Sequence, residues 1–151
     1  MARHLNGYTI FCDDIRQEVA GKTSYIGVYQ DNLITNAPFP MALPKFGISI
    51  TVFYSPLKSK KISEIPFQVF LPGEDAPALQ GAMPLPEISL AANEPTVRMT
   101  AHLILAPLHL KGPGTVRVEA KIDGSSMELG RLRVEQTGPA TASASDQPAA
   151  R

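Results

Sequence analysis

Apolar residues recur at every second position through much of the chain, and this alternation constrains the fold more than any other feature. In the clearest stretch, 115–123, valine, alanine and isoleucine alternate with arginine, glutamate, lysine and aspartate. A period of two is that of a β-strand with one buried and one solvated face, which is typical of antiparallel sheets. Stretches 46–54, 65–71 and 97–105 repeat the pattern. The alternation therefore predicts an all-β protein.

Proline and glycine mark the connections between these stretches. The chain has 14 prolines among 151 residues, which disfavours long helices because an interior proline costs a helix about 3 kcal/mol. Segment 37–44 contains three prolines, and 72–81 combines proline with glycine, so both are predicted loops. The pair Asp123-Gly124 favours a type I′ turn into a last strand at 127–134.

Further strands are expected at 8–14, 24–30 and 33–35, whereas 14–20 is interpreted as a loop or a single turn. The spacing predicts one antiparallel β-sandwich of about seven to eight strands, Ig-like or jelly-roll-like in topology. We expect the core to contain the apolar residues of the inward registers: Ile10, Ile26, Val28, Ile48, Ile50, Val52, Phe67, Val69, Leu103, Leu105, Val116, Val118 and Ile122.

One domain is expected at this length. We place an N-terminal extension at 1–7, the sandwich at 8–135 and a disordered tail at 136–151, since residues 138–151 contain no leucine, isoleucine, valine or aromatic residue. The first residues lack the apolar segment of a secretory signal. No apolar run approaches the roughly 20 residues of a membrane-spanning helix. We therefore expect a cytoplasmic protein that does not associate with membranes.

Charge and cysteine content argue against several functions. Fourteen lysines and arginines balance 14 aspartates and glutamates, so the chain lacks the basic excess typical of nucleic-acid-binding proteins. A single cysteine permits neither an internal disulfide nor a zinc site built on cysteine pairs. His102 and His109 are too few for a metal site and are expected to be solvated. Because the phosphate-loop and G-x-S-x-G motifs are also missing, we predict a non-enzyme without catalytic residues, metal, cofactor or nucleic-acid partner.

Adjacent carboxylates draw attention as candidate binding residues. Asp13 and Asp14 could bind calcium, or one could act as a general base. Successive side chains of a strand point to opposite faces, however, so the two cannot easily share one ion, and we favour a structural role. Cys12 is expected to be a buried thiol that shares an inward face with Tyr8 and Ile10.

Two phenylalanines and a lysine cluster complete the candidate binding residues. Phe53 and Phe70 lie on the polar registers of two strands that we expect to be neighbours. Exposed aromatic residues on one sheet face are typical of a binding surface, although a proline-rich loop could instead cover them. Lys58, Lys60 and Lys61 lie between the two strands and could contact an acidic partner, although a solvated loop is the more frequent situation.

The chain also resembles a known group of proteins in two segments. Residues 10–29 contain a phrase of the form CD…GK…GVY, and residues 112–124 form a strand that begins with proline and glycine and ends in aspartate and glycine. These features resemble an uncharacterised family of bacterial and bacteriophage proteins, over about residues 8–135. The resemblance implies a compact β-sandwich and supplies no activity, cofactor or site residue.

Three functions follow as hypotheses. The leading one is a non-enzymatic protein-interaction or assembly module of a cytoplasmic bacterial or prophage-encoded protein, acting as a homo-oligomer or bound to a protein partner. The first alternative is a phage structural or host-defence-targeting protein. The second is a small-molecule- or sugar-binding β-sandwich, or a hydrolase that uses Asp13 or Asp14 with a histidine. This last hypothesis predicts a pocket lined by aromatic and polar side chains.

Overall fold

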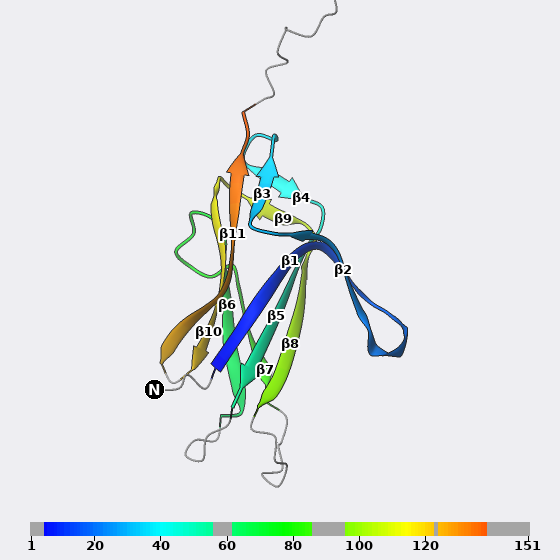
Figure 1. The fold of residues 1–151 in the computed structure, drawn as a ribbon. Coiled ribbons are helices and arrows are strands. Elements are labelled where there is room, and N and C mark those ends of the chain that lie inside the picture. Colours follow the sequence, from blue (N-terminus) through cyan, green and yellow to red (C-terminus); the bar gives the residue numbers. More distant parts are fainter. Residues whose placement is uncertain (1–4, 56–61, 86–95, 123, 139–151) are drawn as a thin grey trace, which may run out of the picture.

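The computed structural model describes residues 5–55, 62–85, 96–122 and 124–138, and these residues form an all-β protein (Figure 1). They contain eleven strands and a single-turn 3-10 helix, η1 (Val19–Gly21). The predicted fold class is confirmed. Within this part of the chain, no helix is both long and apolar enough to cross a membrane.

Two main sheets make up the fold. The first sheet is antiparallel, with strand order β2-β1-β5-β8. The second sheet has the order β3-β11-β10-β6-β7, and β3 runs parallel to β11. The first sheet comprises β1 (Leu5–Gln17), β2 (Thr23–Tyr29), β5 (Phe46–Tyr54) and β8 (Val97–Leu105). The second comprises β3 (Asn32–Thr35), β6 (Glu64–Phe70), β7 (Leu79–Pro84), β10 (Gly114–Ile122) and β11 (Ser125–Gln136).

A single hydrophobic core joins the inward faces of the two sheets. The registers predicted for β5, β6 and β10 are confirmed, because their inward side chains are buried as expected. The fully buried members with the largest side chains are Phe46, Ile48, Ile50, Ile65, Leu108, Leu110, Leu132, Val52, Val69, Val116, Val118 and Val134. Burial of this apolar surface is the main force that holds the sheets together.

Three short strands account for the difference from the predicted seven or eight. β4 (Met41–Leu43) lies in the predicted loop 37–44 and pairs with β9 (Leu108–Leu110) as a separate two-stranded sheet. β7 begins inside the other predicted loop, 72–81, and forms an edge of the second sheet. β4 and β9 have three residues each, which is too short for alternation to reveal. β7 was missed because it contains glycine and proline and overlaps a segment that was predicted to be a loop.

The register of β1 is opposite to the prediction. Phe11 faces the core, whereas Tyr8 is 42% exposed and Ile10 is only partly buried. Thr9, between Tyr8 and Ile10, points inward instead. Here β1 lies close to β11, since a Cβ added to Gly130 of β11 would meet the Thr9 side chain. Because the two sheets approach closely here, only small inward side chains fit. The alternation of apolar residues in the sequence does not reveal such a contact.

The second half of β1 and β2 form a hairpin that projects from the sandwich (Figure 1). We call this hairpin, residues 13–29, the arm. Ile26 and Val28 were predicted to be core residues but are 40% and 45% exposed, because β2 is an edge strand on the projecting hairpin. Gly27 between them has a φ of 66°, and the Asp13 carboxylate occupies the place of a Cβ there. The chain therefore bends at a position that favours glycine.

Candidate functional site

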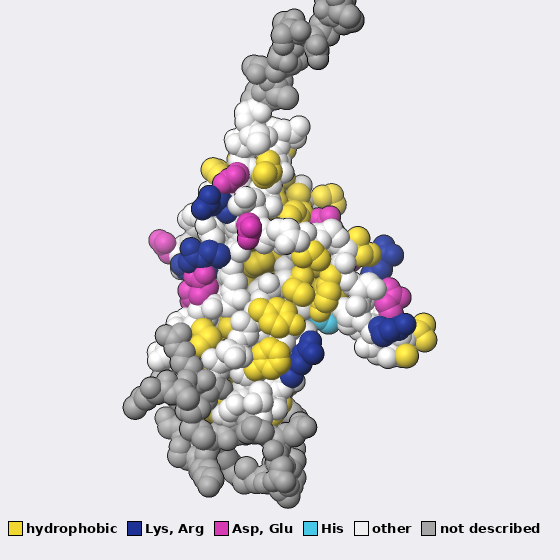
Figure 2. Space-filling view, in the orientation of Figure 1, with side chains coloured by type: hydrophobic (Ala, Val, Ile, Leu, Met, Phe, Trp, Pro, Cys, Tyr) yellow, Lys and Arg dark blue, Asp and Glu magenta, His cyan; other side chains and the backbone are white. Residues whose placement is uncertain are grey.

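The outward side of the first sheet carries exposed apolar side chains. We call it the outer face, and its described residues on β1, β5 and β8 are Asn6, Tyr8, Ile10, Cys12, Gly47, Ser49, Thr51, Phe53, Arg98, Thr100, His102 and Ile104. Tyr8 and Ile104 are 42% and 44% exposed, and hydrophobic side chains gather over these strands in Figure 2. The solvated face of an antiparallel sheet is usually polar. An apolar area on such a face is therefore a candidate interaction site.

Beneath these side chains lies a buried polar floor. Ser49 and Thr51 point away from the core, yet they are 0% and 1% exposed. The two hydroxyl oxygens of Thr51 and Thr100 lie 3.1 Å apart, and the Ser49 hydroxyl lies 3.0 Å from that of Tyr25 on the arm. Because the hydroxyls of Ser49 and Thr51 form hydrogen bonds within the protein, a ligand on the outer face would contact mainly the exposed apolar side chains.

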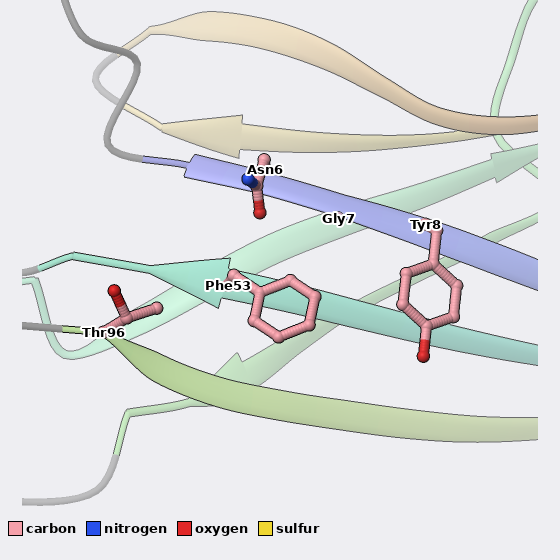
Figure 3. A pocket seen from close by; sticks show the side chains of 5 residues that line it. All are labelled: Asn6, Gly7, Tyr8, Phe53 and Thr96. Atoms are coloured by element: carbon pink, nitrogen blue, oxygen red, sulfur yellow. The ribbon is translucent and has the colours of Figure 1, made fainter.

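Two aromatic rings form one end of the outer face. Tyr8 and Phe53 have ring centroids 6.4 Å apart and planes inclined at 39°. They point to the same side of the sheet and line an open depression of about 540 Å³, together with Asn6, Gly7 and Thr96 (Figure 3). The site thus combines apolar ring faces with an amide and a hydroxyl at its ends.

A hydrogen-bonded histidine ties the arm to the outer face. The Gln17 side-chain amide donates to Nδ1 of His102 (2.9 Å), and Nε2 of His102 lies 3.2 Å from the Tyr25 hydroxyl. The Tyr25 and His102 rings also meet edge to face, with centroids 5.9 Å apart. His102 was predicted to be solvated, but it is partly buried because the arm folds against β8, a contact between residues 77 positions apart.

Phe70 lies far from this site in the fold, so the predicted pairing of the two phenylalanines is wrong. Phe53 belongs to β5 of the first sheet, whereas Phe70 belongs to β6 of the second sheet. Phe70 lies under the guanidinium of Arg117, 4.7 Å from its ring centroid, in a cation–π contact. Successive strands that cross from one sheet to the other cannot share a sheet face.

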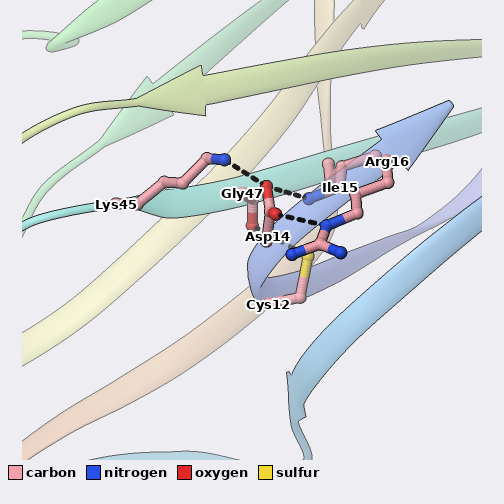
Figure 4. Close-up of polar contacts among 6 residues, drawn as sticks. All are labelled: Cys12, Asp14, Ile15, Arg16, Lys45 and Gly47. Carbon is pink, nitrogen blue, oxygen red and sulfur yellow. Dashed lines mark hydrogen bonds and ion pairs between the residues drawn. The ribbon is translucent and has the colours of Figure 1, made fainter.

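Asp13 and Asp14 lie at the base of the arm and bind different partners. Asp13 accepts a hydrogen bond from the Tyr29 hydroxyl (2.6 Å). Asp14 lies 2.5 Å from the Lys45 ammonium and 3.0 Å from Nε of Arg16 (Figure 4). Lys45 and then Arg16 hold the pKa of the Asp14 carboxyl below its ordinary value. Asp13 therefore shapes the arm from within, and Asp14 attaches it to the sandwich through Lys45.

Burial and the Asp13 carboxylate also change the pKa of two neighbouring groups, the Tyr29 hydroxyl and the Cys12 thiol. Burial, and then the hydrogen bond to Asp13, raise the pKa of the Tyr29 hydroxyl. Burial, and then the charge of Asp13, raise the pKa of the Cys12 thiol. Cys12 is fully buried, as predicted, but it lies on the outward register of β1 and not on an inward face with Tyr8 and Ile10. Its Sγ lies 3.8 Å from the Gly47 carbonyl oxygen. A buried thiol with a raised pKa is a poor nucleophile.

The remaining candidates lie outside the described residues, since Lys58, Lys60 and Lys61 belong to segment 56–61. Among the residues that are described, no group of three or more histidine, cysteine, aspartate or glutamate side chains could hold a metal ion. Sequence reasoning overlooked Tyr8 and Ile104. Ile104 could have been found, because it is an apolar residue on the outward register of an alternating strand, as Phe53 is.

Comparison with known proteins identifies the family but supplies no activity. Residues 7–135 match the sequence profile of a family of unknown function, DUF6941, and the chain belongs to this family. The matched segment covers most of both sheets and every residue of the outer face except Asn6. No curated protein and no solved structure is significantly similar to the chain.

Proposed function

We propose that the protein is a non-enzymatic interaction module that binds a protein partner, or a second copy of itself, through its outer face. The exposure of Tyr8 and Ile104 on a sheet side that is normally polar is the observation that supports this function. Partly exposed aromatic residues that are held rigidly by a sheet are frequent anchors of protein interfaces.

The shape of the site favours a macromolecular partner over a small molecule. Small-molecule sites usually enclose most of their ligand, whereas the depression at Tyr8 and Phe53 is open. A further exposed apolar side chain, Ile104, lies outside the depression on β8, beyond Thr100 and His102. Exposed apolar side chains spread over the face in this way fit a surface or a segment of another protein.

We also propose that the protein acts in the cytoplasm of a bacterium, encoded by a bacterial or prophage gene. The free and buried Cys12 fits a reducing compartment. Fractionation of the source cells, with detection of the native protein, tests this location, and a secreted or envelope-bound protein would contradict it.

Substitution of one exposed ring tests the interaction function. We expect the wild-type protein, immobilised in a lysate of its source cells, to retain a partner, or to self-associate in light scattering. Tyr8→Ser should abolish this because it removes the apolar anchor without adding charge. Ile34→Ser is the matched control, since Ile34 is 61% exposed on β3 of the second sheet. A monomer that captures nothing, or equal binding by all three proteins, would refute the proposal.

A further inference from the structure

Of the described residues that make up the outer face, Arg98 is the one with a charged side chain. It lies directly opposite Phe53 in the register between β5 and β8, so the guanidinium and the aromatic pair are on the same side of the sheet. None of the residues that define the outer face carries a carboxylate. Asp14, further along β1, is already paired with Lys45 and Arg16. The outer face therefore presents an apolar surface with positive charge at one end.

The other described arginines show that this situation is unusual for the protein. Four of the five described arginines form an ion pair with a carboxylate: Arg16 with Asp14, Arg117 with Glu119, Arg131 with Glu128, and Arg133 with Glu135. Arg98 forms no ion pair with any described residue. A guanidinium with free donors beside a hydrophobic patch is suited to bind a carboxylate from a partner.

We propose that the partner contributes an extended acidic peptide segment, in which an apolar side chain lies next to a carboxylate. The apolar side chain packs against Tyr8 and Phe53, and the carboxylate accepts hydrogen bonds from Arg98. This inference rests on the proposed interaction function and specifies the chemistry of the partner. Charge complementarity selects this partner, because a basic segment would be repelled by Arg98.

The length of the outer face favours a peptide over an acidic sugar. Arg98 and Ile104 lie on the same outward register of β8 and are six positions apart, which corresponds to about 20 Å along a strand. A single sugar ring covers only a fraction of this length. A peptide in extended conformation covers it with about six residues.

Selection from a library of random linear peptides displayed on phage tests the proposal, with the full-length protein immobilised. We expect the enriched peptides to contain aspartate or glutamate beside an aromatic or aliphatic residue. The affinity of the most enriched sequence, made as a synthetic peptide, is then measured by calorimetry. Arg98→Glu should weaken binding about tenfold or more, because it replaces attraction by repulsion.

Arg133→Glu is the matched control, because Arg133 is an exposed arginine on β11 of the second sheet and carries the same change of charge. It should bind the peptide as the wild type does. Circular dichroism confirms that both variants are folded. Enriched peptides without acidic residues, or equal affinity of Arg98→Glu and wild type, would overturn the proposal.

Two further outcomes overturn it while separating it from the interaction function. If no peptide is enriched but methyl glucuronide shifts the NMR signals of Tyr8 and Phe53, the site binds an acidic sugar. If the captured partner is lost with Tyr8→Ser but kept with Arg98→Glu, the outer face remains an interaction site and only the acidic segment is refuted. Loss of the partner with both variants supports the proposal.

Discussion

Two adjacent carboxylates of β1 illustrate how single residues are used in this protein. Asp13 contacts Gly27 and Tyr29 across the hairpin, whereas Asp14 reaches Lys45, the residue before β5. One residue thus shapes the arm, and its neighbour attaches the arm to the sandwich. Strand geometry sends successive side chains in different directions, and for this reason the sequence alone favours structural roles for the two residues over a shared ion site.

The ion pairs of Asp14 predict a pH dependence of stability. The pKa of Asp14 is lowered in the folded protein, so its stabilising contribution is present above the ordinary carboxyl pKa. The contribution is lost as pH falls through the lowered folded pKa. We therefore expect Asp14→Asn to be less stable than wild type at neutral pH, and the difference to vanish in acid.

Chemical unfolding of both proteins over a pH series measures this difference. Lys45→Met provides the control, because removing the ammonium should return the Asp14 pKa toward its ordinary value in an NMR titration. A stability difference that stays constant from neutral to acidic pH would show that Asp14 stabilises the arm by a contact other than these ion pairs.

The burial of Cys12 predicts low chemical reactivity. Its thiol is fully buried, and burial raises its pKa, so little thiolate forms at neutral pH. We expect a colorimetric disulfide reagent to react slowly with the native protein and completely after denaturation. Rapid reaction of the native protein would mean that the arm opens frequently and exposes the thiol.

At the scale of the strand, the predictability of the fold depends on what lies opposite each strand. β5 and β10 face the centre of the core, so alternation located them and their inward residues correctly. β1 passes close to β11, and small inward residues such as Thr9 replaced the expected apolar ones. β2 extends onto the arm, where its apolar residues have no core to enter. Burial patterns that depend on distant strands cannot be read from local alternation.

The bend of the arm predicts a specific cost for substitution at Gly27. A non-glycine residue with left-handed φ costs about 1–2 kcal/mol, and at Gly27 the new Cβ would also collide with the Asp13 carboxylate. Gly21→Ala is the matched control, because Gly21 has a φ of 71° but open space around it. We expect Gly27→Ala to destabilise the protein by about 2 kcal/mol or more, beyond the loss in Gly21→Ala.

Thermal or chemical unfolding of the two variants measures these losses. In a background with Asp13→Ala, the excess cost of Gly27→Ala should decrease, because the colliding carboxylate is gone. Equal losses for Gly21→Ala and Gly27→Ala would show that backbone conformation alone, without the collision, determines the effect.

At the scale of the whole molecule, the sandwich was predictable but the assignment of strands to sheets was not. β5 and β6 follow one another in the chain, and the sequence pattern is the same whether they pair or face each other across the core. The structure puts them in different sheets, which separates Phe53 from Phe70. The outer face could therefore be assembled only after the order β2-β1-β5-β8 was known.

The shared core predicts that a single buried charge will unfold both sheets together. Val118 is fully buried on β10, which lies between β11 and β6 at the centre of the second sheet. Val118→Asp would bury an unpaired carboxylate, at a cost of about 4 kcal/mol or more. Since small domains are stable by only about 5–15 kcal/mol, we expect a large fall in Tm or loss of the cooperative transition in circular dichroism.

Lys121→Asp on the same strand is the control, because Lys121 is exposed and a surface substitution changes stability by only about 0.5 kcal/mol. NMR follows the signals of each sheet separately. If the signals of both sheets are lost together, the two sheets unfold as one cooperative unit. If Val118→Asp melts like the parent protein, the inward register of β10 is wrong. If only the second sheet loses its structure, the outer face could fold and bind independently of its supporting sheet.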